Sequence, residues 1–205
     1  MLIKLPEQFH PPLWDEYEKR RQHAAITPWF AQQSEVNRFR ARYRLAKSFR
    51  GLNLEGYTDD TKAGYEALTK VAFFWSAYEQ MLRALKIKDG REVIKNYPMK
   101  EVIKKIKKLD SELKFFRFVR QKLKDENHLK DKVTIFINGG ACTVLTLAAS
   151  VRHIYLHGHL TANVQRLHPS IVVQICDLLA DSILTIIDTE FKESIETLMI
   201  AYPEH

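Results

Sequence analysis

The chain has 205 residues, of which 45% are apolar and 28% charged, which is enough apolar content for one domain with its own core. Only seven glycines and seven prolines interrupt it, and this composition favours an all-α protein over an all-β or disordered one. The formal charge of +7 is concentrated in two blocks, with ten Lys/Arg against five Asp/Glu in residues 1–50 and fourteen against seven in residues 91–132. A polyanion is therefore the partner to test.

The start of the chain is expected to be an extended arm followed by helices. Residues 1–12 show no periodicity, and a short helix is predicted over 13–22. A longer helix is predicted from Pro28 to Arg50, with Thr27 as its N-cap. We expect residues 1–50 to form an N-terminal arm and basic helices packed on a bundle made by residues 51–205.

Arginines alternate with aromatic residues in this helix, in the run R-F-R-A-R-Y-R. Such residues can pair with phosphates and stack on bases, which makes the four arginines candidates for RNA binding. A helix, however, spreads alternate residues around its circumference. The favoured interpretation is therefore that the aromatic residues lie in the core and the arginine stems lie along the surface. The candidates are Arg38, Arg40, Arg42 and Arg44.

The middle of the chain predicts further helices. One is capped by Asp59 or Asp60 and runs to about Lys88, a short amphipathic one follows Pro98, and another covers 113–123. Lysines beside the amphipathic segment are either RNA-binding or simply solvated. These lysines are Lys104, Lys105, Lys107 and Lys108.

The next stretch is expected to lack helix. Residues 125–131 are polar and loop-like, and the β-branched run 133–137 predicts a strand or an extended buried loop. Gly139 and Gly140 could cradle a phosphate before the following helix, but a plain turn is favoured because no phosphate-binding glycine motif is present. The last helix is predicted over 171–199, starting at 168–170.

The helix that begins near Ala141 carries the densest group of reactive side chains at its end. It reads S-V-R-H-I-Y-L-H-G-H, and Gly158 suits the C′ position of a helix terminus. Arg152 is a permanent cation that can hold a phosphate, and His157 supplies an imidazole, a group that exchanges protons near neutral pH in proteins. These are two of the roles that metal-free RNA cleavage needs, and a second proton-transfer group could come from His153, from His159 or from a two-fold partner.

Two other interpretations of this segment remain open. Arg152 could form an interhelical salt bridge with Asp177 or Asp181, and His157 could be no more than a helix C-cap. The histidines at 153, 157, 159 and 168 could also bind a metal, although the segment lacks the glutamate of a zincin. We expect no metal and no cofactor.

The segment from Arg152 to His157, R-H-I-Y-L-H, resembles the R-x(4–6)-H signature of the HEPN superfamily, and the long helices around it resemble that family's four-helix bundle. The resemblance covers residues 59–199 and implies an up-and-down all-α bundle that acts as a metal-independent endoribonuclease. It implies Arg152 and His157 as catalytic residues with His153 in support, at the interface of a homodimer. It also implies a role in toxin–antitoxin, phage-defence or RNA-processing systems; a non-catalytic interaction or immunity module is the alternative.

Cysteine usage and hydropathy bear on the compartment. Cys142 and Cys176 lie 34 positions apart in apolar stretches, which indicates reduced core residues rather than a disulfide or a zinc pair. The first ten residues have no apolar core typical of a signal peptide, and no uncharged apolar run reaches the roughly 18 residues of a membrane span. A cytoplasmic protein without membrane contact is expected.

Overall fold

The computed structural model describes residues 9–21, 29–90, 93, 97, 99–124, 126–162, 164 and 167–203. Within these residues the chain is helical with irregular connections and no strand, so the prediction of an all-α bundle is confirmed. The described helices are α1 (Trp14–Arg20), α2 (Gln33–Ser48), α3 (Asp59–Ala84), α5 (Lys100–Leu109), α6 (Lys114–Lys122), α7 (Asn127–Ile137), α8 (Val144–Leu156) and α9 (Pro169–Ala201).

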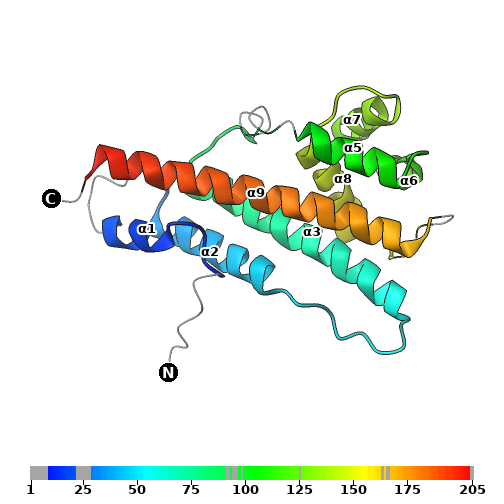
Figure 1. The fold of residues 1–205 in the computed structure, drawn as a ribbon, viewed down its shortest axis with the longest axis horizontal. Helices are drawn as coiled ribbons and strands as arrows, with labels where there is room; N and C mark the ends of the chain where they lie inside the picture. Colours follow the sequence, from blue (N-terminus) through cyan, green and yellow to red (C-terminus); the bar gives the residue numbers. More distant parts are fainter. Residues whose placement is uncertain are drawn as a thin grey trace.

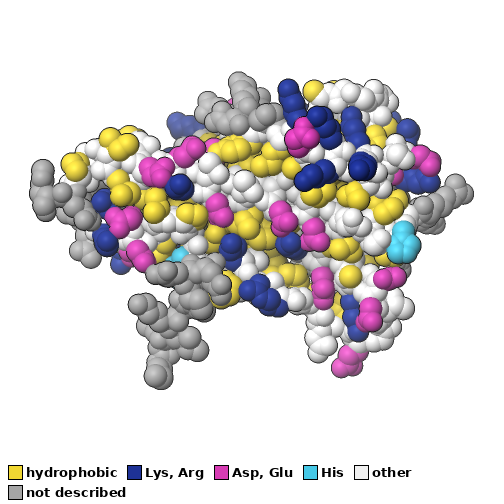
Figure 2. All heavy atoms as spheres, in the orientation of Figure 1, with side chains coloured by type: hydrophobic (Ala, Val, Ile, Leu, Met, Phe, Trp, Pro, Cys, Tyr) yellow, Lys and Arg dark blue, Asp and Glu magenta, His cyan; other side chains and the backbone are white. Residues whose placement is uncertain are grey.

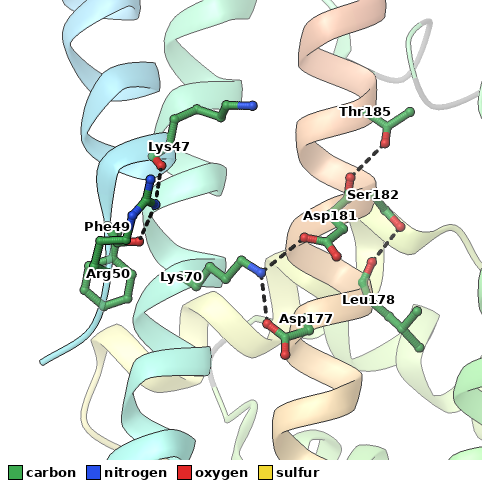
Figure 3. A network of polar contacts seen from close by, with 9 residues as sticks. All are labelled: Lys47, Phe49, Arg50, Lys70, Asp177, Leu178, Asp181, Ser182 and Thr185. Carbon is green, nitrogen blue, oxygen red and sulfur yellow. Dashed lines mark hydrogen bonds and ion pairs between the residues drawn. The ribbon is translucent and has the colours of Figure 1, made fainter. Parts of the chain in front are cut away.

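Helices α3 and α9 form the centre of the bundle and run in the same direction (Figure 1). Between them, the Lys70 ammonium lies 3.0 Å from Asp177 and 3.2 Å from Asp181 (Figure 3). Burial alone would lower the pKa of Lys70, but the two carboxylates outweigh it and raise that pKa. The charged pair of α9 is therefore engaged by Lys70 from α3.

Helix α2 packs against α3 and runs antiparallel to both α3 and α9 (Figure 1). The Tyr43 hydroxyl donates a hydrogen bond of 2.7 Å to Asp188 of α9, and the Phe39 and Phe191 rings lie 5.1 Å apart. From α1, Trp14 stacks on Phe191 with centroids 6.0 Å apart. The N-terminal helices therefore share an aromatic core with α9, while the domain division at residue 50 remains a prediction.

Helices α5 to α8 cover the other side of the central pair (Figure 1). Their fully buried side chains include Ile106, Phe116, Phe136 and Ile154, which belong to the same hydrophobic core as α3 and α9. Each short helix buries one apolar stripe and leaves its charged stripe in solvent.

The interpretation of residues 125–137 as a loop and a strand is wrong, because α7 spans Asn127–Ile137. Val133 and Phe136 are buried three residues apart, which is helical spacing. The β-branched residues weakly disfavour a helix, but packing against α6 and α8 outweighs this preference. The expected turn is confirmed, since the Gly139 and Gly140 N–H groups donate to the carbonyls of Phe136 and Ile135 and close α7.

Two helix starts differ from the prediction. Thr58, and neither Asp59 nor Asp60, caps α3, because its hydroxyl accepts a hydrogen bond from the Thr61 N–H at 3.3 Å. Helix α2 begins at Gln33, after Phe30 has entered the core. The predicted cap and first residue at positions 27 and 28 lie outside the described residues.

Among the described helices, only α9 is long and apolar enough to cross a membrane by length and composition. Half of its most apolar 18-residue stretch is buried in the bundle. A helix at the centre of a core meets the same criteria, and the packing of α9 against α3, α5 and α8 explains its composition.

Candidate functional site

The candidate site lies at the C-terminal end of α8. His157 is the C-cap residue, and Gly158 follows in the left-handed conformation with φ +71°. The Gly158 N–H donates to Tyr155 and the His159 N–H to Ile154, which is the hydrogen-bond pattern of a Schellman motif. The predicted helix end is confirmed, and it leaves His157 and His159 exposed.

Helix α8 is fixed on α3 by two polar contacts. The Tyr155 hydroxyl lies 2.8 Å from the Thr69 hydroxyl, and the Arg152 guanidinium lies 3.8 Å from Glu79. Glu79 also accepts a hydrogen bond of 2.9 Å from the Trp75 indole. The acid that faces Arg152 is thus on α3. The expected alternatives Asp177 and Asp181 are wrong as its partners, because they face Lys70 instead.

The ion pair of Arg152 is loose and partly exposed. The Arg152 side chain retains 32% of its accessible surface and that of Glu79 retains 43%. At 3.8 Å, the contact is longer than a hydrogen bond, and such exposed pairs contribute about 0–1 kcal/mol. The guanidinium is therefore held near the helix end without being neutralised by a tight bidentate partner.

His153 and His157 stand on one face of the helix and touch. Their ring centroids are 4.4 Å apart with an interplanar angle of 41°. His153 Nδ1 also lies 3.9 Å from Glu126, the residue that precedes α7. Burial lowers the pKa of His153, the neighbouring His157 lowers it further, and Glu126 opposes both. The neutral form of His153, which can accept a proton, is favoured.

The segment after α8 is positioned by a close approach to α3. A Cβ atom added at Gly64 would lie 2.7 Å from the Cβ of Ala162, closer than such atoms approach in proteins. Gly64 is buried in the interior of α3, so the missing side chain makes room for the segment that carries His157 and His159.

The arginines of α2 lie on a different side of α3 from α8 (Figure 1). Phe39 and Tyr43, which alternate with them, are fully buried and cannot stack on bases. The Arg40 guanidinium lies 4.7 Å from the centre of the Trp14 ring and 3.3 Å from His10 Nδ1. Arg38 pairs with Glu35 at 2.6 Å, while Arg42 is exposed and Arg44 half-buried. The favoured reading of buried aromatics and surface arginines therefore describes Phe39 and Tyr43 correctly.

The lysines of α5 form a third group. Lys104 pairs with Glu101 at 2.7 Å, and Lys107 lies 5.2 Å from the centre of the Phe136 ring. Lys105 and Lys108 are exposed, and no carboxylate in the described part of the chain pairs with them. The structure thus gathers the three residues of α8 and places the α2 and α5 cations on other helices.

Metal ligation has no geometric support in the described ranges, where no three His, Cys, Asp or Glu side chains are arranged to hold an ion. Cys142 and Cys176 are free thiols. Burial raises the pKa of Cys142 to about 11 and also raises that of Cys176, so both stay protonated near neutral pH.

Two acidic residues next to the candidate site, Glu79 and Glu126, were not predicted from the sequence. Glu79 lies 73 positions before Arg152, so no helical periodicity links the two residues. Glu126 lies in the stretch expected to be a loop. One signal was present: Trp75 and Glu79 stand four residues apart, a spacing at which an indole and a carboxylate can pair on a helix.

The fold and this cluster define an all-helical protein with a guanidinium and two imidazoles at one exposed helix end. No protein-family model matches the chain, and neither a curated protein nor a solved structure matches it.

Proposed function

We propose that the chain is a metal-independent endoribonuclease of HEPN type. The observation that carries the proposal is the grouping of Arg152, His153 and His157 at one partly exposed helix end. A guanidinium stabilises charge on phosphorus, and imidazoles move protons near neutral pH. RNA, a second copy of the chain, and a cognate antitoxin or defence-system protein in the cytoplasm are the partners that this proposal includes.

The reaction assigns one role to each group. A base takes the proton of the ribose 2′-OH, the 2′ oxygen attacks the adjacent phosphorus, and the bond from phosphorus to the 5′ oxygen breaks. An acid protonates the departing 5′ oxygen, which leaves a 2′,3′-cyclic phosphate and a 5′-OH. Arg152 stabilises the extra negative charge on the phosphorane. The lowered pKa of His153 supports a role as the base or as a residue that assists the base. His157 is the more exposed of the two histidines and donates or accepts the proton that is exchanged with solvent.

The contact between the two rings favours a two-fold dimer in this proposal. The attacking and leaving oxygens of an in-line displacement lie on opposite sides of phosphorus. Rings with centroids 4.4 Å apart are in van der Waals contact and leave no space for a phosphate between them. His153 and His157 therefore serve one side, and a symmetry-related pair serves the other.

Cleavage of a labelled RNA in EDTA tests the proposal. The wild-type chain should cleave it and leave 2′,3′-cyclic phosphate ends, and Arg152→Ala and His157→Ala should each lower the rate about 100-fold or more. His128→Ala is the matched control, because His128 is an exposed histidine on α7. Cleavage that persists in both α8 variants contradicts the proposal.

The loose pair between Arg152 and Glu79 favours a second candidate, a non-catalytic helical interaction module. In that case Arg152 ties α8 to α3, and the chain should bind a protein partner without cleaving RNA. Glu79→Gln separates the two candidates. In the nuclease, this variant frees Arg152 to bind a phosphate, so RNA cleavage persists. In the interaction module, it only loosens the contact between α8 and α3, and no RNA is cleaved.

A further inference from the structure

Helix α6, which packs against α8 next to the candidate site, carries a row of cations. Phe115, Phe116 and Val119 of α6 are buried. Arg117 and Arg120 lie outside this buried stripe, one helical turn apart, and both are exposed. Figure 2 shows Lys and Arg side chains gathered over the α5–α6 end of the face in view.

The two arginines are anchored by neutral acceptors. Arg117 Nε donates a hydrogen bond of 3.0 Å to the carbonyl oxygen of Glu112, and Arg120 Nε donates one of 2.7 Å to the Thr134 hydroxyl. Thr134 in turn donates to the Lys130 carbonyl at 2.7 Å. Each guanidinium is thus oriented through one edge while its charge stays uncompensated, since no carboxylate among the described residues pairs with it.

This arrangement differs from an ordinary solvated charge. A free lysine must lose side-chain rotamer entropy when it binds, whereas an arginine held through Nε has part of that freedom already removed. Its two terminal NH₂ groups remain available to a phosphate, which guanidinium groups bind in a bidentate way.

The row leads toward the candidate site. Lys124 lies four residues after Arg120, just beyond the end of α6, and is exposed. Glu126 is two residues further, at most about 7 Å along the chain. Glu126 lies 3.9 Å from His153. A phosphate chain that passes over α6 would therefore reach the imidazoles of α8 within a few nucleotides.

We propose that Arg117 and Arg120, continued by Lys124, bind successive phosphates of single-stranded RNA and direct it to the end of α8. The inference rests on the proposed function for the identity of the polyanion. Single-stranded RNA is favoured because in-line attack needs a strand that can bend, and cationic tracks of this kind follow a single strand's backbone.

The test is a binding measurement by fluorescence anisotropy, with a labelled 20-nucleotide 2′-O-methyl RNA that cannot attack its own phosphates. Arg117→Ala/Arg120→Ala should weaken binding about tenfold or more and lower the slope of log K against log salt by about 1.4. Lys105→Ala/Lys108→Ala on α5 removes the same charge and should change affinity less than about threefold. Thermal unfolding by circular dichroism verifies that both variants fold.

Three results would overturn the inference: equal weakening by both double variants, no weakening by the α6 variant, or competition by poly-L-glutamate as strong as that by RNA. Cleavage of unmodified RNA is measured separately in the wild type and in His157→Ala. If nothing cleaves but binding depends on the α6 pair, the inference stands and the nuclease proposal fails. If cleavage depends on His157 and binding ignores the α6 pair, the nuclease proposal stands and this inference fails.

Discussion

Helices α2 and α6 both combine arginines with aromatic residues, yet they hold their arginines differently. In α2, Arg40 lies over the Trp14 ring and beside His10, so its guanidinium is part of the packing between α1 and α2. In α6, Arg117 and Arg120 bond neutral oxygens and keep their charge toward solvent. A count of cations therefore does not identify a polyanion surface. The partner of each cation decides whether its charge is available.

The largest expected effect is the difference in RNA cleavage between two variants, each of which removes one arginine from a different side of α3. Arg152→Ala should lower RNA cleavage about 100-fold or more, because the phosphorane loses its cation. Arg40→Ala should leave cleavage unchanged and lower the free energy of unfolding by about 1 kcal/mol, because a cation–π contact and its packing are lost. Cleavage rates and urea unfolding of both variants measure this. Equal loss of cleavage in both would remove the distinction.

Two tyrosines compare the attachment of α2 and α8 to the central pair. Tyr43→Phe should lower the free energy of unfolding by about 1–3 kcal/mol. The reason is that Asp188, whose pKa is already raised by burial, loses the hydroxyl that donates a hydrogen bond to it. Tyr155→Phe removes a bond to the neutral Thr69 hydroxyl and should cost about 1 kcal/mol. Urea unfolding at neutral pH measures both. A larger loss for Tyr155→Phe would show that α8 is the more tightly held.

Gly64→Ala tests the seat of the segment after α8. Alanine would gain about 1 kcal/mol of helix propensity, but the new Cβ meets Ala162 at 2.7 Å and overpacking costs about 1–3 kcal/mol. We expect a net loss of about 1 kcal/mol in the free energy of unfolding. Ala162→Gly in the same chain should restore part of it, because it removes the nearest atom. No recovery in this double variant would place the strain elsewhere.

The smallest expected effect is a pH dependence from His153. Because the fold lowers its pKa, the unfolded chain binds more protons, so the contribution to stability is complete above the ordinary pKa of about 6.5 and is lost as pH falls through the lowered value. Wild type should therefore lose more stability than His153→Gln between pH 7.5 and 5.5. Urea unfolding at both pH values measures it, with His128→Gln as control. A wild type that gains stability on acidification would reverse the sign.

Elements with clear helical periodicity could be predicted from the sequence. The sequence predicts α9 from its long apolar stripe and the end of α8 from Gly158. Both features depend on residue type at nearby positions, because burial selects apolar residues and a positive φ selects glycine. Helix α7 was missed because its β-branched residues favour a strand locally, while the packing that makes it helical comes from α6 and α8.

The candidate site was predictable only in part. Arg152, His153 and His157 are close in sequence, so helical spacing is enough to group them. Their acidic neighbours Glu79 and Glu126 come from other helices, and no local pattern links them to α8. The hydrogen bonds of Arg117 and Arg120 could not be predicted from the sequence either, because their acceptors are a backbone carbonyl and a hydroxyl, which carry no charge.

The parallel pairing of α3 and α9 has a consequence for biosynthesis. The two helices are separated in the chain by residues 85–168, so their contact closes a long loop and cannot form until α9 has left the ribosome. During that interval the apolar stripe of α3 lacks its main partner. A nascent chain in this state should bind a chaperone that recognises exposed apolar helices, and release should follow the synthesis of the last helix.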